Sequence, residues 1–265
     1  MSVERILFVN QEITPYVEAS YMSIIGRYLP QSILEKGIDI RTFMPRYGII
    51  NERRNQLHEV IRLSGQNIII NGNDHMLIIK VASIQSIRMQ TYFIDNEEFF
   101  KRKFMLYEKV GKFFPDNDER AIFYARGVVE TVKNLGWSPD VIHCHGWISC
   151  LVPLFVKEIY KDNPLFANSK IVYSVYDDTF DKTLRSLSSK LKASGIPANV
   201  ASLYKQATFE STTKLAIDYS DAVIISHKDA DENICSYVSE SKKPYFRHTE
   251  EQYGDEYISL YNSIM

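Results

Sequence analysis

Short apolar runs alternate along this chain with stretches of helical periodicity, and this alternation constrains the fold more than any other feature. The segment Arg5–Asn10 contains consecutive apolar residues, as expected for a strand that is buried on both faces. The next stretch carries Met22, Ile25 and Leu29 at helical spacing and ends at Gly37, a typical C-terminal stop. The same criteria predict further strands at 38–43, 91–94, 140–145, 170–175 and 221–226, and helices at 116–135, 146–160, 209–219 and from 229.

Strands that alternate with helices form βαβ units, so we expect an α/β fold with a doubly wound, mostly parallel, Rossmann-like sheet. The Asn71-Gly72 pair lies between two aliphatic runs and predicts a β-hairpin insertion, because it supplies the positive φ of a type I′ turn. The polar segment 240–253 predicts a linker. A short helix with Tyr257 and Tyr261 on one face is expected after it.

The charge balance excludes several classes of partner. Lys and Arg number 31 and Asp and Glu number 33, which gives a net charge of −2 and no basic footprint for nucleic acid or an anionic membrane. The three cysteines, Cys144, Cys150 and Cys235, form no CxxC pair, which argues against a disulfide framework and a structural zinc site. No apolar run has the length of a signal segment or a transmembrane helix, so we expect a cytoplasmic protein.

Open α/β sheets bind ligands at the carboxyl ends of their strands, and four of these ends are chemically rich here. They are Asn10–Pro15, Asp95-Asn96, His143–Trp147 and Tyr176–Asp178. The first of these loops has neither GxGxxG nor GxxxxGK[ST], so we expect no dinucleotide and no cofactor.

His143 and His145 lie two residues apart on a predicted strand, so both should face the same side of the sheet. Two imidazoles together with Asp177 or Asp178 could ligate zinc. No third ligand has a fixed spacing, however, and we favour two hydrogen-bonded histidines without a metal. Cys144 should point to the opposite side, which favours a buried structural thiol over a Cys-His nucleophile pair.

Two acidic segments have interpretations of their own. Asp177 and Asp178 could act as an acid/base pair, but adjacent residues on an extended chain point to opposite sides, and we favour a solvated turn. Asp116 has the spacing of a capping box, so its side chain should accept a hydrogen bond from the first turn of the helix that follows. We predict no element in the polar sequence between about 176 and 208.

Five segments in order resemble the N-terminal domain of bacterial glycogen synthases and plant starch synthases, over about residues 3–240. They are Glu12–Tyr16, Phe43–Gly48, Tyr92–Asn96, Asp116–Arg120 and Asp140–Trp147. The resemblance implies the N-terminal half of a GT-B fold and a retaining glucosyltransferase that uses a nucleotide-glucose donor. It also makes Glu12, Pro15, Tyr16, Asp95, Asn96, His143, His145 and Trp147 the candidates for a ligand pocket.

The chain departs from the family at the residues that bind the donor. Where the family has the lysine of a KTGGLADV-like loop, this chain has Glu18. Ser20 and Tyr21 stand at the positions of the family's paired glycines. Ile148 stands where the family usually has a histidine, directly after the tryptophan of the HxHxW segment. Tyr173–Asp178 stands where the family has a TxHN-like turn. These positions imply a degenerate donor site, and no residue is assigned as catalytic.

Length is the second departure, because the family's second Rossmann-like domain is not part of this sequence. We interpret residues 1–240 as the synthase-like domain, and residues 241–265 as a linker and a helix that packs back on it. Any amphipathic C-terminal helix would look similar. The favoured function is an α-glucan-binding or regulatory protein without transferase activity of its own. The alternatives are an active glucosyltransferase using ADP-glucose or UDP-glucose, or a half-enzyme completed by a partner chain at the face of the missing domain.

Overall fold

The structure is a computed structural model that describes residues 2–84, 87, 89–249 and 253–265. Within these residues the strands are β1 (Arg5–Asn10), β2 (Asp39–Pro45), β3 (His58–Glu59), β4 (Gln66–Ile70), β5 (Asn73–Ile84), β6 (Met89–Asp95), β7 (Val141–His145), β8 (Lys170–Val175), β9 (Ala222–Ile225) and β10 (Tyr245–Arg247).

The helices of the described residues follow the same alternation. The α-helices are α1 (Tyr21–Glu35), α2 (Glu97–Phe100), α3 (Asn117–Leu135), α4 (Val152–Glu158), α5 (Leu187–Ala193), α6 (Ala198–Ala201), α7 (Phe209–Asp218), α8 (Glu232–Glu240) and α9 (Asp255–Ser263). Short 3-10 turns are η1 (Ile61–Leu63), η2 (Trp147–Ser149) and η3 (Ser202–Tyr204).

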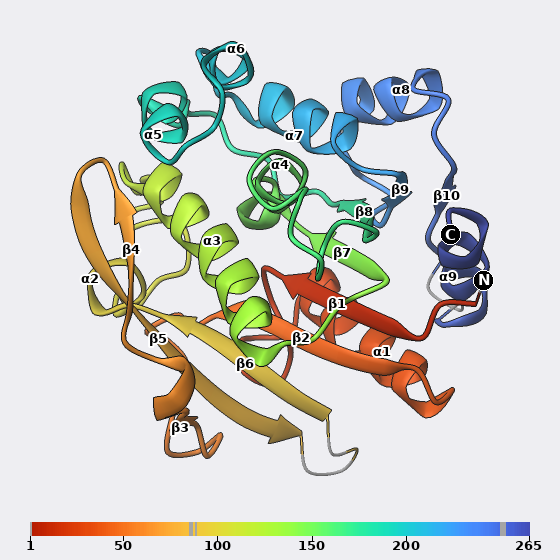
Figure 1. Cartoon of the computed structure of the whole chain (residues 1–265), viewed down its shortest axis with the longest axis horizontal. Helices are drawn as coiled ribbons and strands as arrows, with labels where there is room; N and C mark the ends of the chain where they lie inside the picture. The colour runs from red at the N-terminus through yellow and green to blue at the C-terminus, as the bar shows by residue number, and fades with distance from the viewer. Residues whose placement is uncertain (1, 85–86, 88, 250–252) are drawn as a thin grey trace.

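The expected doubly wound α/β fold is confirmed. The sheet has the order β10-β9-β8-β7-β1-β2-β6-β5-β3, and the strands from β10 to β6 are parallel. The chain leaves β1 toward β2 on one side and returns through β7 on the other, which makes the β1–β7 pair the switch point of the sheet. Helices α3, α4 and α7 pack together on one face, and α1 and α9 lie on the other (Figure 1).

The β-hairpin insertion is confirmed at the predicted turn. β4 and β5 pair antiparallel, with Ile70 opposite Asn73, and the turn residues Asn71 and Gly72 have φ of 50° and 80°. β5 continues past the hairpin and pairs antiparallel with β6, which extends the parallel sheet at one edge.

Helix α9 packs against the strand β7 and the helix α1. The Tyr261 hydroxyl lies 2.7 Å from Nδ1 of His143, and the Asn262 amide accepts a hydrogen bond from the backbone N–H of Val3. An ion pair joins Lys36, just after α1, to Asp255 at the start of α9. The division of the chain near residue 240 stays a prediction.

Three local predictions differ from the structure. Asp116 does not cap α3 with its side chain, because its carboxylate instead forms a two-pronged ion pair with Arg102. The segment 240–253 is not only a linker: β10 lies in it and pairs parallel with β9, although residues 250–252 lie outside the described residues. The polar sequence before α7 contains α5 and α6, whose buried side chains Leu187, Leu191 and Ala201 are spaced too widely to stand out among serines and lysines.

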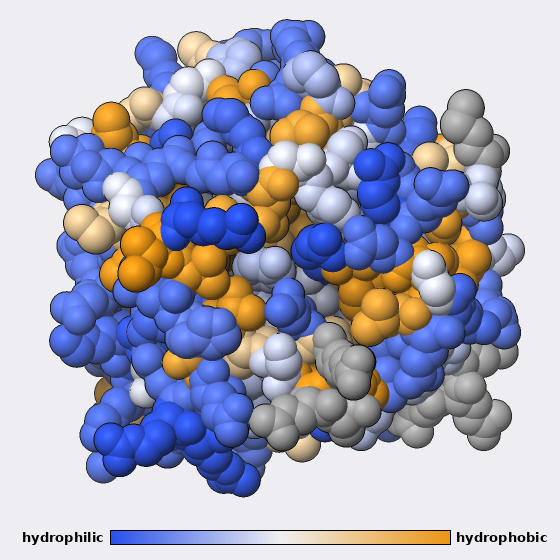
Figure 2. Space-filling model, turned by 60° about the horizontal axis from the view of Figure 1, so that its bottom comes forward, coloured by the Kyte–Doolittle hydropathy of each residue, from blue (hydrophilic) through white to orange (hydrophobic). Residues whose placement is uncertain are grey.

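In the described part of the chain, no helix is long and apolar enough to cross a membrane. Figure 2 shows apolar residues gathered in separate patches within a mainly hydrophilic surface on one side of the molecule.

Candidate functional site at the carboxyl ends of the strands

The candidate residues lie at the switch point, where β1, β7 and β8 end side by side. Asn10 is paired in register with His145, and His145 with Ser174. The loops that follow these three strands begin with Gln11, Gly146 and Tyr176. Sequence motifs on three separate segments therefore meet at one edge of the sheet, as the strand-end rule predicts.

His143 and His145 face the same side of β7, with their ring centroids 3.9 Å apart. His143 uses both ring nitrogens: Nδ1 lies 2.7 Å from the Tyr261 hydroxyl and Nε2 lies 2.8 Å from the Ser174 hydroxyl. Nδ1 of His145 lies 2.8 Å from the Tyr176 hydroxyl. We call these five residues the histidine cluster. It belongs to the packing between the sheet and α9.

The histidine cluster is fully buried, and burial sets its charge. Desolvation, together with the neighbouring His145, lowers the pKa of His143 well below the ordinary histidine value. Burial, with a smaller effect of His248, lowers the pKa of His145 to about 3. Both imidazoles are therefore neutral at physiological pH and do not serve as cationic groups for a diphosphate.

A pocket of about 520 Å³ opens beside the ends of β1, β7 and β8. It is lined by Gln11-Glu12, residues 104–109, Gly111, Trp147 and residues 177–179, and we call it the strand-end pocket. Its ionisable side chains are Glu12, Glu108, Lys109, Asp177 and Asp178, and its aromatic side chains are Phe104, Tyr107 and Trp147. Carboxylates therefore outnumber the single ammonium group.

Among the carboxylates of the strand-end pocket, Asp178 has the pKa that is shifted furthest from its ordinary value. Its Oδ2 accepts a 2.7 Å hydrogen bond from the backbone N–H of Trp147. Burial raises the pKa of Asp178, the Trp147 N–H opposes the rise and the negative charge of Glu12 adds to it, and together they bring this pKa to about 7. Asp177 is exposed, as a solvated turn requires, whereas Asp178 is only partly exposed, because the loop folds its carboxylate against η2.

The first turn of α1, where the family's donor loop would lie, already has its own polar partners. The Ser20 hydroxyl accepts a hydrogen bond from the Ser23 N–H and donates one of 2.6 Å to Glu12. Glu18 is exposed, and Tyr21 packs edge-to-face on His227 with a centroid distance of 4.8 Å. The anion-binding end of the helix is therefore capped by a hydroxyl and flanked by two carboxylates.

Ile148 points into the core. Its side chain is fully buried, and its backbone N–H donates to the Gln11 side chain at 3.2 Å. Gln11 fits there because Gly146 has φ of 79° and no Cβ, and a Cβ at Gly146 would lie 2.8 Å from Oε1 of Gln11. The position that the resemblance assigns to an imidazole therefore holds a buried apolar side chain.

Asp95 and Asn96 lie at the end of β6 and are already engaged. The Asp95 carboxylate pairs with Arg46 and Lys80, each at 3.0 Å, and is almost completely buried. Asn96 caps α2 by accepting from the N–H groups of Glu98 and Phe99. Neither residue lines the strand-end pocket, so the structure gives both a contact that stabilises the fold.

The two remaining candidates of the first loop differ in exposure. Pro15 is exposed and follows a cis peptide bond at Thr14. Tyr16 is buried and packs edge-to-face on Phe93 with a centroid distance of 4.9 Å. Burial raises the pKa of Tyr16 above its ordinary value. Tyr16 therefore packs in the core and presents no open aromatic face.

Cys144 lies on the opposite face of β7 from the histidines and is buried. Burial raises the pKa of this thiol well above its usual value, so it is a protonated thiol rather than a thiolate nucleophile. Among the described residues, no three histidine, cysteine, aspartate or glutamate side chains gather into a group that could hold a metal ion.

Residues 104–109 and 111 line the strand-end pocket although no pattern in the sequence predicts a site there. This segment has no strand or helix, and its Tyr107 and Glu108 carry no motif spacing. The sequence feature that could have pointed to this segment is its excess of aromatic and charged residues, between α2 and α3. The strand-end rule does select Asp178, in the loop that follows β8, but no spacing in the sequence indicates that its carboxylate folds against η2.

The fold and its switch point define this chain as a Rossmann-like α/β domain, of the kind that forms half of a GT-B glycosyltransferase. The chain belongs to the glycogen and starch synthase family, because the model of the starch synthase catalytic domain matches residues 5–247. The glycogen synthase of Chlorobium luteolum is 38% identical to this chain over 174 residues. This alignment covers 65% of this chain and 36% of that relative. The glycogen synthase of Chlorobaculum tepidum gives the same identity and coverage.

The solved catalytic domain of starch synthase IV from Arabidopsis thaliana, bound to ADP and acarbose, superposes with a TM-score of 0.73. Its sequence is 16% identical, and the match covers 93% of this chain and 51% of that chain. This likeness shows the fold. The chain thus spans about half of that structure and a smaller share of the curated relatives that it matches.

Proposed function

We propose that this chain binds a neutral α-glucan in the strand-end pocket and does not by itself transfer glucose from a nucleotide donor. The observation that carries the proposal is the first turn of α1. Ser20 caps that turn and is hydrogen-bonded to Glu12, and exposed Glu18 stands where the family has a lysine.

Charge opposes a diphosphate at this position. The helix N-terminus attracts anions through unpaired N–H groups and its dipole. Here the Ser20 hydroxyl takes one of those N–H groups, and the Glu12 carboxylate lies 2.6 Å from that hydroxyl. Each charge-assisted hydrogen bond is worth roughly 1.5–3 kcal/mol. The loss of one cationic contact and the addition of carboxylates therefore remove most of the affinity for a nucleotide donor.

The same pocket suits a neutral sugar. Carboxylate oxygens accept hydrogen bonds from sugar hydroxyls without any charge repulsion. The aromatic side chains of Phe104 and Tyr107 offer apolar surfaces for the C–H faces of a sugar ring. A volume of about 520 Å³ lies within the range of roughly 300–1,000 Å³ that is usual for small-molecule sites.

The experiment uses the intrinsic fluorescence of Trp147. The chain has two tryptophans, and Trp137→Phe leaves Trp147, which lines the strand-end pocket, as the reporter. We expect maltoheptaose to change the emission of this variant in a saturable way. ADP-glucose and UDP-glucose should produce no saturable change up to millimolar concentration.

A matched pair of variants localises the binding. Tyr107→Ala removes an aromatic surface of the pocket, and Leu203→Ala removes an exposed side chain elsewhere. Loss of the maltoheptaose response in the first variant alone supports the proposal. Tighter binding of a nucleotide sugar than of maltoheptaose would contradict it.

The second candidate is a glucosyltransferase that a partner chain completes at this edge. Phe104 and Val110, in and beside the segment that lines the pocket, are 41% and 83% exposed, and such apolar side chains favour a protein contact. The test is incorporation of labelled glucose from ADP-glucose and UDP-glucose into glycogen. Turnover that appears only when a cell extract is added to the purified chain, and that a substitution at Trp147 abolishes, would favour this candidate, whereas turnover by the purified chain alone would show that no partner is needed.

A further inference from the structure

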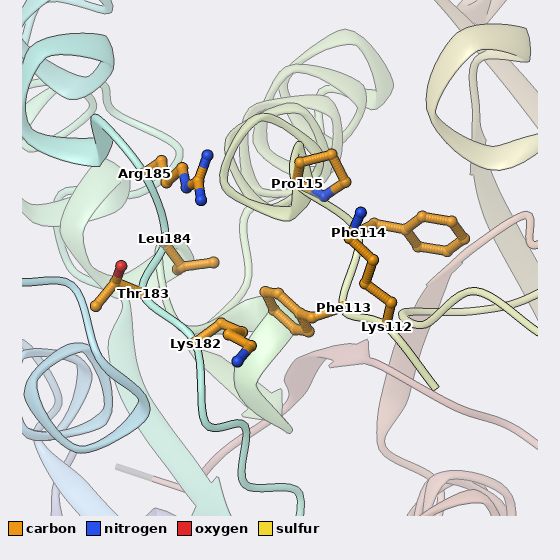
Figure 3. A pocket seen from close by; sticks show the side chains of 8 residues that line it. All are labelled: Lys112, Phe113, Phe114, Pro115, Lys182, Thr183, Leu184 and Arg185. Carbon is orange, nitrogen blue, oxygen red and sulfur yellow. The ribbon is translucent and has the colours of Figure 1, made fainter. Parts of the chain in front are cut away.

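A second, smaller pocket lies next to the strand-end pocket and has the opposite charge. It has a volume of about 220 Å³ and is lined by residues 112–115 and 182–185; we call it the basic pocket. Its three ionisable side chains, Lys112, Lys182 and Arg185, are all cationic and exposed. Figure 3 shows Phe113 and Leu184 in the middle of the pocket, with the three cations around them.

The carboxylates near the basic pocket already have partners of their own. Asp116 is paired with Arg102, and the carboxylates of Asp118 and Glu119 are both paired with Lys190. These pairs offset two of the three negative charges at the start of α3, which follows the pocket in sequence.

The cations of the pocket keep most of their charge uncompensated. Within the described residues, Lys112 and Arg185 have no carboxylate within 4.0 Å. In the part of the chain that the structure describes, the one carboxylate paired with Lys182 is that of its exposed neighbour Asp181, at 3.4 Å. An exposed pair of this kind contributes little. The pocket thus has cationic side chains on several sides of an apolar floor, in a chain whose net charge is −2.

The two pockets lie between the same two segments of the chain. Residues 107–109, Gly111 and residues 177–179 line the strand-end pocket, and residues 112–115 and 182–185 line the basic pocket. Aromatic contacts join them: Phe113 stacks on Phe180 with a centroid distance of 4.9 Å, and Trp147 lies 5.6 Å from Phe113. A ligand in the basic pocket would therefore contact a side chain that packs on the wall of the strand-end pocket.

We propose that the basic pocket binds the phosphate monoester of a sugar. Lys112, Lys182 and Arg185 hold the phosphate, since lysine and arginine form strong charge-assisted hydrogen bonds with phosphate oxygens. The apolar floor of Phe113 and Leu184 contacts the C–H face of the sugar ring. This site is separate from the proposed glucan site and does not depend on it.

The size of the basic pocket selects a small ester. A volume of about 220 Å³ is below the range of roughly 300–1,000 Å³ that drug-sized ligands occupy. It fits one ring with one phosphate better than a nucleoside diphosphate. Inorganic phosphate would meet the cations but leave the apolar floor uncovered, so it should bind more weakly.

Calorimetric titration of the full chain with glucose 6-phosphate and glucose 1-phosphate tests the proposal. Inorganic phosphate, glucose and AMP are titrated in parallel. We expect at least one of the two esters to bind about tenfold more tightly than inorganic phosphate, glucose or AMP. The affinity should fall as ionic strength increases, because the cations are exposed.

A matched pair of double variants decides whether the basic pocket is responsible. Lys182→Ala with Arg185→Ala should weaken the ester at least about tenfold, because it removes two charge-assisted contacts. Lys161→Ala with Lys205→Ala removes the same charge from exposed positions outside both pockets and should leave the affinity unchanged. Unfolding midpoints confirm that both proteins are folded.

Three results would overturn the proposal: no binding of either ester, equal binding of inorganic phosphate, or equal binding by the two double variants. Maltoheptaose binding is measured on the same proteins. If the Lys182/Arg185 variant loses the ester and keeps maltoheptaose, the two sites are distinct. If wild type binds the ester but not maltoheptaose, the glucan proposal fails while the basic pocket stands.

Discussion

The histidine cluster and the strand-end pocket lie at the same edge of the sheet, yet they use their polar groups in opposite ways. In the cluster, hydroxyl groups meet three of the four ring nitrogens of His143 and His145, and α9 covers the pair. In the pocket, Glu12, Glu108 and Asp177 keep at least part of their surface open.

The difference teaches that a family motif at a strand end need not remain a ligand-binding motif. The two histidines of the HxHxW segment are retained here, but burial keeps them neutral and their partners are side chains of the protein itself. The side chains that line the strand-end pocket come instead from the loops after β1, β7 and β8 and from residues 104–109 and 111. Stability and binding can therefore be tested separately.

The largest expected effect is a loss of stability in acid, caused by the histidine cluster. Between about pH 6.5 and 4.5 the unfolded chain protonates both histidines, while the folded chain does not, because their folded pKa values are lowered. Over the same pH range Asp178 has the opposite effect, because its pKa in the folded chain is raised to about 7. The folded chain keeps a proton on Asp178 that the unfolded chain loses, and this proton offsets one of the two histidine protons. The net effect is about one proton, or about 1.4 kcal/mol per pH unit.

We therefore expect the free energy of unfolding to fall by about 2–3 kcal/mol from pH 6.5 to 4.5. Urea unfolding at several pH values measures it. His145→Asn should reduce the pH slope, and the exposed His58→Asn serves as the control. A wild-type stability that stays constant down to pH 4.5 would contradict the burial of two neutral histidines.

The second prediction concerns the strand-end pocket and has the opposite sign. Asp178 costs stability as it ionises, so stability is lost as pH rises from about 4, its pKa in the unfolded chain, to about 7. Asp178→Asn keeps an acceptor for the Trp147 N–H and removes this cost. We expect a gain of about 1–2 kcal/mol at pH 8, and about twice the wild-type acid slope below pH 6.5.

Asp177→Asn is the matched control for this variant, because Asp177 is the exposed neighbour on the same loop. It should change the free energy of unfolding at pH 8 by no more than about 0.5 kcal/mol. Its acid slope should equal that of the wild type. The same stability at pH 8 in both variants would show that ionised Asp178 does not cost stability.

The parallel sheet could be predicted because each strand is a local apolar pattern. Segments such as Arg5–Asn10 and Lys170–Val175 are continuous runs, and Asn71-Gly72 is a specific turn signal. The partner of a side chain is not a local property. Asp116 satisfies the pattern of a helix cap, but Arg102 competes for its carboxylate with a charge-assisted pair.

The candidate site was predictable to the level of the loops and not to the level of individual side chains. Glu12 and Trp147 line the strand-end pocket, whereas Asp95 and Asn96 are engaged in an ion pair and a helix cap. Burial of Asp178 depends on how its loop folds against η2, which no spacing in the sequence encodes. Strand ends predict where chemistry gathers, and tertiary contacts decide which groups stay open.

The smallest expected effect is that of restoring the family's lysine. Glu18→Lys changes the local charge by two units at an exposed position, but it leaves the capped turn of α1 and its partner Glu12 unchanged. Ile148 also remains buried, with no polar group toward a sugar. We expect binding of ADP-glucose to stay millimolar or weaker, and transfer to glycogen to stay undetectable.

The measurement is titration of wild type, Glu18→Lys and the double variant Glu12→Gln with Glu18→Lys by ADP-glucose. Only the double variant removes the carboxylate that accepts from Ser20, so it should show the larger gain of the two. Micromolar binding by Glu18→Lys alone would mean that one exposed charge excludes the donor. The capped first turn of α1 would then not be the feature that separates this pocket from a donor site.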